Sequence, residues 1–249
     1  MTYRGVMLIQ AVRLLLLPFV LLSAWLSIEK NPGNPYSDAD YLLYYLMVPL
    51  IMNLTNSQKI FRFPQAVKDG SLSRDLLKPF PPVLIFVIDV LTSNLVQLIY
   101  LFPITAICII IFNSRLPSLQ IGPVGFFIFL MAILAGLTMR IMVSGSIALL
   151  GFWIEDVTTL NLVLNGGIWA LLGGMIVPVA TFPESIRRIA SYLPYRYMLS
   201  FPIEILSGKL SASEIFSGFL VIAAWSCVLF FLIKFIWKSG LKTFTAYGG

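Results

Sequence analysis

The sequence predicts an all-α membrane protein with six transmembrane helices, and two observations support this fold class. Hydrophobic residues make up 59% of the chain and charged residues only 11%, with a mean hydropathy of +0.92. Soluble domains average roughly 45–50% apolar and about 25% charged residues. In addition, six apolar segments reach or approach the roughly 20 residues that cross a bilayer. We expect one transmembrane domain over residues 1–249, with spans at about 6–28, 41–57, 83–112, 124–150, 161–181 and 214–237.

The first of these segments resembles a signal peptide, because Arg4 and Arg13 precede the run LLLLPFVLLSAWLS. No small-x-small cleavage site follows this run, so we expect a retained helix. The orientation follows from the basic residues, which favour the cytoplasmic side. They recur between the second and third spans and at the end of the chain, as Lys59, Arg62, Lys68, Arg74, Lys78, Lys234, Lys238 and Lys242. Both termini are therefore predicted to be cytoplasmic, with Glu155 and Asp156 in an acidic turn on the same side.

The composition also excludes several classes of chemistry. The net charge is +6, but the basic residues flank apolar segments instead of gathering on one solvated face, so we predict no binding of nucleic acid. The chain has no His, and we predict no catalytic residue and no metal site. No phosphate-binding loop GxxxxGK[ST] occurs, so we expect no cofactor in this chain. Cys108 and Cys227 lie in apolar runs, where small packing residues are expected.

The stretch KDGSLSRDLLKPFPP joins the second and third spans. It predicts a short helix, a Gly-containing turn, and a second helix that is capped by Ser71 or Ser73 and stopped by Pro79. Such an element on the inner face would be a docking surface, although a basic loop that only fixes topology fits the same residues. We expect two groups of side chains, with Leu72, Leu76 and Leu77 toward apolar contacts and Lys68, Arg74 and Asp75 toward water.

The segment FPESIRRIASYLPYRYMLSFPIEILSGKL before the last span is too charged to cross a bilayer and too apolar for an ordinary loop. We expect re-entrant or interfacial helices at the outer face, broken into short pieces by proline. Short surface helices that only cover the bundle are the alternative. The apolar residues Ile186, Ile189, Leu193 and Tyr197 recur at helical spacing, and the basic residues expected at the outer interface are Arg187, Arg188 and Arg196.

Three stretches of the chain resemble the bacterial ABC type-2 exporter permeases. They are VKDGSLSRDLLKPFPP, the segment from GFWIEDVTTLNLVL to SFPIEILSGKL, and WKSGLKTFTAYGG. One subgroup of that family carries an I-R-x-G-x-L-x-x-x-L-L-x-R-P loop and ends its fifth span with G-x-x-x-P-x-x-x-F-P. Here Val67 and Lys68 replace Ile-Arg, and Lys78 replaces the later Arg, which keeps the charge but not the bidentate hydrogen bonding of Arg. The resemblance covers nearly the whole chain in length, number of spans and their order.

This resemblance implies a permease subunit of an ABC transporter, embedded as a multi-pass protein in the lipid of the bacterial cytoplasmic membrane. Such a subunit pairs with a second permease, identical or homologous, and two ABC ATPase subunits dock on its cytoplasmic elements. ATP and Mg belong to the ATPase, so this chain is a transport subunit and not an enzyme. The residues implied in coupling are Lys68, Asp69, Leu72, Arg74, Asp75, Leu76, Leu77, Lys78, Glu155 and Asp156.

Polar residues in the third and fourth spans are candidates for the translocation path. Asp89, Ser93, Gln97 and Tyr100 recur at i, i+4, i+8 and i+11 on one helix face, which in lipid must face protein or water. Arg140 in the fourth span lies within about one turn of the depth of Asp89. Either the two charges form a buried ion pair that braces the helices, or they line a substrate cavity open to the cytoplasm.

The fifth span carries small residues on adjacent turns, namely Gly166, Ala170 and Gly173. Such residues let helices approach closely, so this face borders either the path or another helix of the same subunit. Trp169 lines a neighbouring face. Asn165 lies near the cytoplasmic end of the span, where it would either contact substrate or cap the helix.

The resemblance leaves the substrate open among amphipathic or hydrophobic molecules: lipid, glycolipid, peptide or drug. The basic residues would tolerate an anionic amphiphile, but lipid headgroups explain the outer ones equally well. The rival function is an ion-coupled secondary transporter that uses Asp89 and Arg140. Transporters of that class usually show internal repeats, and the two halves of this chain share no convincing pattern. Dependence of transport on ATP or on an ion gradient would separate the two functions.

Overall fold

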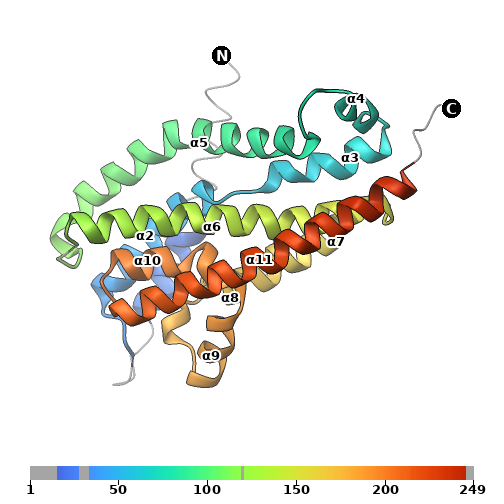
Figure 1. The fold of residues 1–249 in the computed structure, drawn as a ribbon. Coiled ribbons are helices and arrows are strands. Elements are labelled where there is room, and N and C mark those ends of the chain that lie inside the picture. Colours follow the sequence, from blue (N-terminus) through green and yellow to red (C-terminus); the bar gives the residue numbers. More distant parts are fainter. Residues whose placement is uncertain (1–15, 28–33, 119–120, 245–249) are drawn as a thin grey trace, which may run out of the picture.

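The computed structural model describes residues 16–27, 34–118 and 121–244, which form helices and loops without any strand. Three long helices run side by side along the molecule (Figure 1) and are long and apolar enough to cross a membrane. They are α5 (Pro82–Phe112), α6 (Pro123–Leu149) and α11 (Ala212–Thr243). These helices confirm the predicted all-α class and, within a few residues, the third, fourth and sixth segments. The six-span topology stays a prediction.

Helix α2 (Asp38–Leu54) lies at the centre of the bundle. Its side chains are buried from Tyr41 through Pro49, because this helix is apolar on all faces. The helix begins in a capping box, in which Ser37 and Asp40 satisfy each other's backbone N–H groups. With 17 residues it is as long as the predicted second span but begins and ends three residues earlier, and it is shorter than the roughly 20 residues that usually cross a bilayer. A further apolar helix, Leu16–Ser27, is the described part of the predicted first span.

The connection from α2 to α5 contains the two short helices predicted from the sequence. The 3-10 helix η1 (Gln58–Phe61) leads into α3 (Arg62–Lys68), and a turn at Gly70 with φ of 71° precedes α4 (Leu72–Leu76). The predicted serine cap is wrong, because no side chain caps α4. Instead, the Asp69 carboxylate accepts a hydrogen bond from the Ser71 backbone N–H at 2.9 Å. This local bond closes the turn from the preceding helix.

The predicted fifth span over 161–181 is wrong in its second half, because the helix ends at Leu172. It consists of α7 (Thr158–Asn161), the π-helical segment η4 (Leu162–Ile168) and α8 (Trp169–Leu172). Gly174 then adopts a φ of 91°, a backbone conformation that stops a right-handed helix. The chain continues through η5 (Val179–Thr181) toward the next short helices.

The segment before α11 folds into three short helices: α9 (Glu184–Tyr192), η6 (Pro194–Met198) and α10 (Ser200–Leu206). Every residue of α10 is buried, and this helix packs against α6 and η6. By contrast, α9 projects from the bundle, with Ile186, Ile189 and Tyr192 exposed (Figure 1). The short pieces follow the predicted proline breaks, since Pro183 precedes α9 and Pro194 begins η6.

Two clusters of buried apolar residues form the core. The larger one is centred on α2 and includes residues of α6, α10 and α11. The smaller one joins α3, α4, α5 and the end of α6, and includes Phe63, Leu72 and Phe86. We call the region around the smaller cluster the α4 end: α3, α4, residues 150–157 and the last turns of α11. We call the opposite region the α9 end: α9, η6, α10 and the first turns of α2.

Candidate functional site

The α4 end brings together the two elements that the sequence assigns to coupling. The short 3-10 helix η3 (Leu150–Phe152) follows α6 and packs directly on α3. The rings of Phe63 and Phe152 meet edge to face, with centroids 5.2 Å apart. The approach is closest at Gly151, where a Cβ would lie 2.9 Å from the Pro64 Cβ. The loop after α2 and the turn after α6 therefore form one continuous packed unit.

The C-terminal part of α11 joins the same unit. Trp237 lies 5.9 Å from both Phe63 and Phe152, between ring centroids, and Phe244 lies 6.2 Å from Phe152. Figure 1 shows this end of α11 beside α3 and α7. Because three segments distant in sequence share one aromatic cluster, a force applied to α4 or to residues 151–157 can act on the ends of both α6 and α11.

The α4 end carries an exposed apolar surface with charges around it. Leu72 is fully buried under α4, but Leu76 is 37% exposed and Leu77 is 87% exposed. The expectation that all three leucines face apolar contacts is therefore correct for Leu72 alone within the subunit. Trp153 and Ile154 are also exposed, on the adjoining turn. Exposed leucine and tryptophan on short, well-packed elements are typical of a protein–protein contact.

The charged residues of the α4 end are solvent-exposed or nearly so, and mostly engaged locally. Lys78 binds Asp75 at 2.7 Å within the loop. The Asp156 carboxylate accepts a hydrogen bond from the Thr158 N–H at 2.8 Å, and this bonding, with Lys68 nearby, lowers the pKa of Asp156. Asp156 is therefore ionised at neutral pH. The remaining predicted coupling residues with charge are Asp69, Arg74 and Glu155.

The polar stripe predicted on α5 lines a cavity of about 850 Å³. Its walls come from the Leu16–Ser27 helix, the end of α2, η1 and α5. Asp89, Ser93, Gln97 and Tyr100 all contribute to the lining, and Gln97 donates a hydrogen bond to Ser93 at 3.2 Å. This arrangement favours the cavity alternative over an interhelical brace for these residues.

The structure does not bring Asp89 and Arg140 together, so the predicted buried ion pair is wrong. Asp89 instead binds Arg62, the first residue of α3. Arg140 is buried on α6, with its guanidinium carbon 3.6 Å from the ring centroid of Trp169. Two atoms at this contact, Arg140 Nη1 and Trp169 Nε1, are buried without a hydrogen-bond partner in the described part of the chain. The two side chains therefore contact different partners, Asp89 on α5 and Arg140 on α6.

Comparison with family models matches residues 8–248 to the ABC-2 family transporter proteins. The match covers far more than half of the 249 residues. The chain belongs to this family. It is therefore a permease of an ABC transporter, a multi-pass membrane protein that associates with an ABC ATPase. No curated protein and no solved structure matches the permease.

Asn165 of the permease belongs to a buried polar chain and not to a helix cap. It donates hydrogen bonds to Ser144 at 3.1 Å and to Asn161 at 2.9 Å, and Ser144 in turn contacts Ser57 at 2.6 Å. These contacts tie the π-helical segment η4 to α6 and to the loop after α2. Asn165 precedes Trp169 by about one helical turn, and its contacts connect the α4 end with the middle of the bundle.

Among the described residues, two glycines of the fifth segment meet no other helix. A Cβ at Gly167 would meet nothing within 4 Å, and one at Gly166 would meet only its own helix neighbour Leu162. Gly173 lies beyond the helix and contacts Trp169 of the preceding turn. Within the described part of the chain Gly166 therefore has no intrasubunit helix contact, while Ala170 is buried. The open face of η4 includes the exposed side chains of Leu162 and Val163.

The α9 end contains a buried charge that sequence reasoning missed. Glu204 on α10 is fully buried, where it accepts hydrogen bonds from Arg196 at 2.5 Å and from Ser200 at 2.8 Å. The Tyr44 hydroxyl extends this network, since it donates to the Gly174 carbonyl at 2.6 Å and contacts Ser200. The predicted role of Arg196 as an exposed outer interfacial cation is therefore wrong, because its side chain is largely buried against Glu204.

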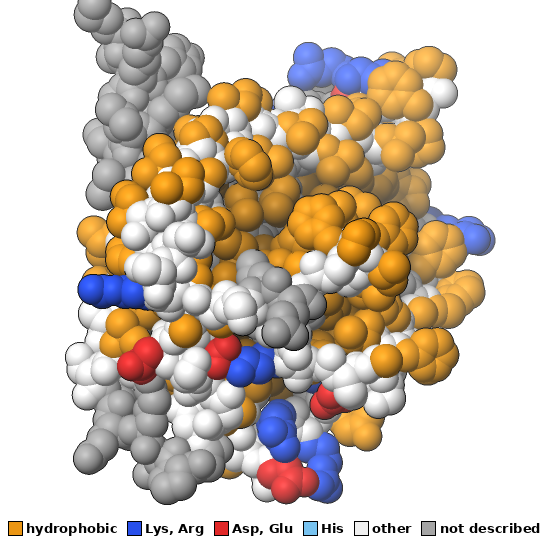
Figure 2. Space-filling view, turned by 90° about the vertical axis from the view of Figure 1, so that its left-hand side faces the viewer, with side chains coloured by type: hydrophobic (Ala, Val, Ile, Leu, Met, Phe, Trp, Pro, Cys, Tyr) orange, Lys and Arg blue, Asp and Glu red, His pale blue; other side chains and the backbone are white. Residues whose placement is uncertain are grey.

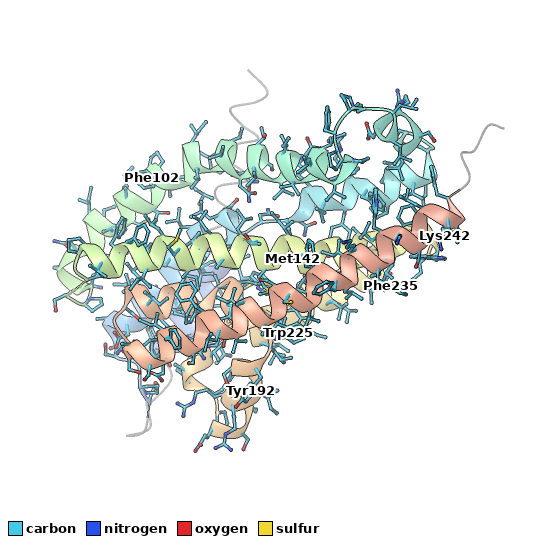
Figure 3. All side chains as sticks on the ribbon, in the orientation of Figure 1. Phe102, Met142, Tyr192, Trp225, Phe235 and Lys242 are labelled. Atoms are coloured by element: carbon cyan, nitrogen blue, oxygen red, sulfur yellow. The ribbon has the colours of Figure 1, made fainter. Side chains whose placement is uncertain are left out.

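The other two predicted outer cations are exposed, as expected. Arg187 and Arg188 lie on α9, where Arg188 binds Glu184 at 2.6 Å across one turn. Figure 2 shows basic and acidic side chains interleaved along the lower part of the face that it presents, below a broad apolar expanse. In Figure 3, Tyr192 marks the exposed end of α9 and Trp225 lies above it on α11. Trp225 holds α9 in place by donating to the Tyr192 carbonyl at 2.7 Å.

Proposed function

We propose that this permease is the transmembrane subunit of an ATP-driven exporter that moves an amphipathic or hydrophobic substrate outward. In this proposal the α4 end faces the cytoplasm and is the docking surface for the ATPase. Two ATPase copies carry ATP and Mg, and a second permease, identical or homologous, completes the complex in the bacterial cytoplasmic membrane. The observation that carries the proposal is the packing of both predicted coupling elements into one unit at the α4 end.

Packing makes the α4 end stiff enough to pass on a movement of the ATPase. The α4 helix is anchored by buried Leu72, while Leu77 one turn later is free to contact a partner. The same unit includes Phe152 at the end of α6 and Trp237 on α11. Movement of the docked ATPase is thereby transmitted to two long helices at once. The exposed face of η4, around Gly166 and Gly167, supplies a smooth surface for the second permease.

The contacts of Asp89 and Arg140 do not favour the ion-coupled alternative. That alternative uses Asp89 and Arg140, and Asp89 is engaged by Arg62. Arg140 contacts Trp169 and no carboxylate in the described chain. ATP-driven movement needs no such pair, because the energy arrives through the docking surface.

The first experiment replaces an exposed leucine at the docking surface. Leu77→Glu places a charge at an 87% exposed position, so it leaves folding unchanged and prevents apolar docking. We expect loss of ATP-dependent transport in vesicles that contain the permease and the ABC ATPase purified with it from its native membrane. The matched control is Ile189→Glu on α9, a position 59% exposed at the opposite end. It should transport as the unchanged chain does.

Two outcomes would contradict the proposal. If Leu77→Glu transports normally, the α4 end is not the coupling surface. If the unchanged complex moves substrate with an ion gradient and without ATP, the chain is not powered by the ATPase.

A further inference from the structure

The cavity beside α5 is lined by a group of charged side chains and, along α5, by both polar and apolar side chains. Arg62 binds Asp89 at the cavity, Lys59 of the preceding η1 is also in its lining, and the lining continues along α5 as far as Tyr100. From Asp89 to Tyr100 the helix rises by about 16 Å, at about 1.5 Å per residue. The apolar lining outside α5 consists of Leu17, Pro18, Met52 and Met175, beside the polar Asn56 and Gln58. A volume of about 850 Å³ is within the range of cavities that hold a drug-sized molecule.

The charge of the cavity favours an anion. Its lining contains two cations and one carboxylate. Asp89 binds Arg62, and no carboxylate of the described residues forms an ion pair with Lys59. Lys59 is exposed, so its ammonium group is available to a phosphate or carboxylate that enters the cavity. The cavity lining therefore carries an excess of one positive charge.

The wall of the cavity continues onto the outer surface of α5. Val96 lines the cavity and is 46% exposed, while its neighbour Leu95, at 64% exposure, does not line it. The exposed surface of α5 is apolar along its length, and Figure 3 shows Phe102 projecting from it away from the bundle. An apolar chain can therefore pass between the cavity and the space beside α5 without leaving apolar surroundings.

We propose that this cavity binds an anionic amphiphile. Its phosphate or carboxylate group contacts Lys59 and Arg62, polar groups next to it contact Ser93 and Gln97, and its apolar chain lies against Met52 and Val96. Asp89 is a positioning residue, because its bond to Arg62 fixes the guanidinium at the cavity. As a substrate site this inference rests on the proposed function, since it names the class of molecule that the exporter collects from the inner leaflet.

Binding is tested on the purified permease alone, in uncharged maltoside micelles without ATPase or ATP. Native mass spectrometry compares dioleoyl phosphatidylglycerol, dioleoyl phosphatidylcholine and inorganic phosphate. We expect phosphatidylglycerol to bind about tenfold more tightly than phosphatidylcholine, which has the same chains, because a charge-assisted contact is worth about 1.5 kcal/mol or more. Inorganic phosphate should not displace it. Displacement by phosphate at equal concentration would overturn the amphiphile in favour of a small anion.

Two matched pairs of variants locate the site. Lys59→Gln should reduce the preference for phosphatidylglycerol about tenfold, whereas Lys234→Gln, an exposed lysine on α11, should leave it unchanged. Val96→Trp fills the cavity and should weaken binding of both lipids, whereas Leu95→Trp on the same helix should not. Equal effects within either pair would overturn the site.

The test of lipid binding and the test of ATP-driven transport can fail independently of each other. If the preference for phosphatidylglycerol is absent but ATP drives transport, this inference alone fails. If the preference is present and follows Lys59 but ATP drives nothing, the proposed function fails and the binding site remains.

Discussion

The α4 end and the α9 end differ in where charged side chains lie. At the α9 end, Glu204 is fully buried and is held by Arg196 and Ser200 at hydrogen-bond distance. At the α4 end the charges lie at or near the surface, and a leucine that is 87% exposed stands beside them. A buried network of hydrogen bonds favours a single arrangement of the helices that share it, while an exposed apolar surface gains free energy only when a partner covers it. The difference lies between η6 and α10, which this network holds in one shape, and the α4 end, whose exposed leucine is suited to a partner; α9 itself carries exposed charged and apolar side chains.

The largest effect is expected from breaking the buried pair at the α9 end. Glu204→Ala leaves Arg196 buried without its counter-charge, which should lower the free energy of unfolding by about 3–5 kcal/mol. The midpoint of thermal unfolding of the purified chain in detergent measures this loss. The control is Glu184→Ala, whose partner Arg188 is 70% exposed, and the expected cost is below about 0.5 kcal/mol.

A double variant keeps this prediction testable if Glu204→Ala fails to fold. Glu204→Leu combined with Arg196→Met removes both charges and should recover most of the stability. Equal unfolding midpoints for the Glu204 and Glu184 variants would show that the buried network does not stabilise the α9 end.

A smaller effect is expected from the backbone turn that ends α8. Gly174 has a φ of 91°, and an added Cβ would lie 2.4 Å from the Tyr44 hydroxyl oxygen. Gly174→Ala should therefore cost more than about 2 kcal/mol, from backbone strain together with this overlap. Gly208 has a φ of 67° but open space around it, so Gly208→Ala should cost only about 1 kcal/mol. Thermal unfolding compares the two, and a larger loss at Gly208 would contradict the packing of Tyr44 against the turn.

The smallest effect is expected where the charges are exposed. Asp89→Asn breaks the bond to Arg62, whose side chain is 64% exposed, and should cost at most about 1 kcal/mol. A double-mutant cycle with Arg62→Gln should show coupling, whereas a cycle with Arg140→Gln should be additive within about 0.5 kcal/mol. Coupling between Asp89 and Arg140 alone would restore the ion pair that the structure rejects.

The long helices and the polar stripe could be predicted from sequence because both depend on local periodicity. Asp89 and Tyr100 recur on one face of α5 whatever the neighbouring helices do, and the structure places both in the same cavity. The turn at Gly70 was likewise predictable, because only glycine adopts its positive φ easily. The exposure of Arg187 and Arg188 could also be predicted, because both belong to the charged face of α9.

The ion pairs could not be predicted, because the partner of a charge depends on how helices rotate against one another. Asp89 has Arg62 as its partner, 27 residues earlier in the chain, across a loop whose path the sequence does not fix. Glu204 lies in the apolar stretch SFPIEIL, where only the burial of α10 gives it a role. The sequence did not predict the end of α8, because apolar residues continue past Gly174 although the positive φ of this residue ends the helix.

The most direct test of the central claim is a crosslink between the α4 end and the ATPase. Cys108 and Cys227 are free thiols, so both are first replaced by Ser. Leu77→Cys or Ile189→Cys is then introduced, and the complex is treated with a short thiol-to-amine crosslinker. Docking at the α4 end predicts a permease–ATPase crosslink from Leu77→Cys and none from Ile189→Cys. A crosslink from Ile189→Cys alone would place the ATPase at the wrong end of the molecule and contradict the account.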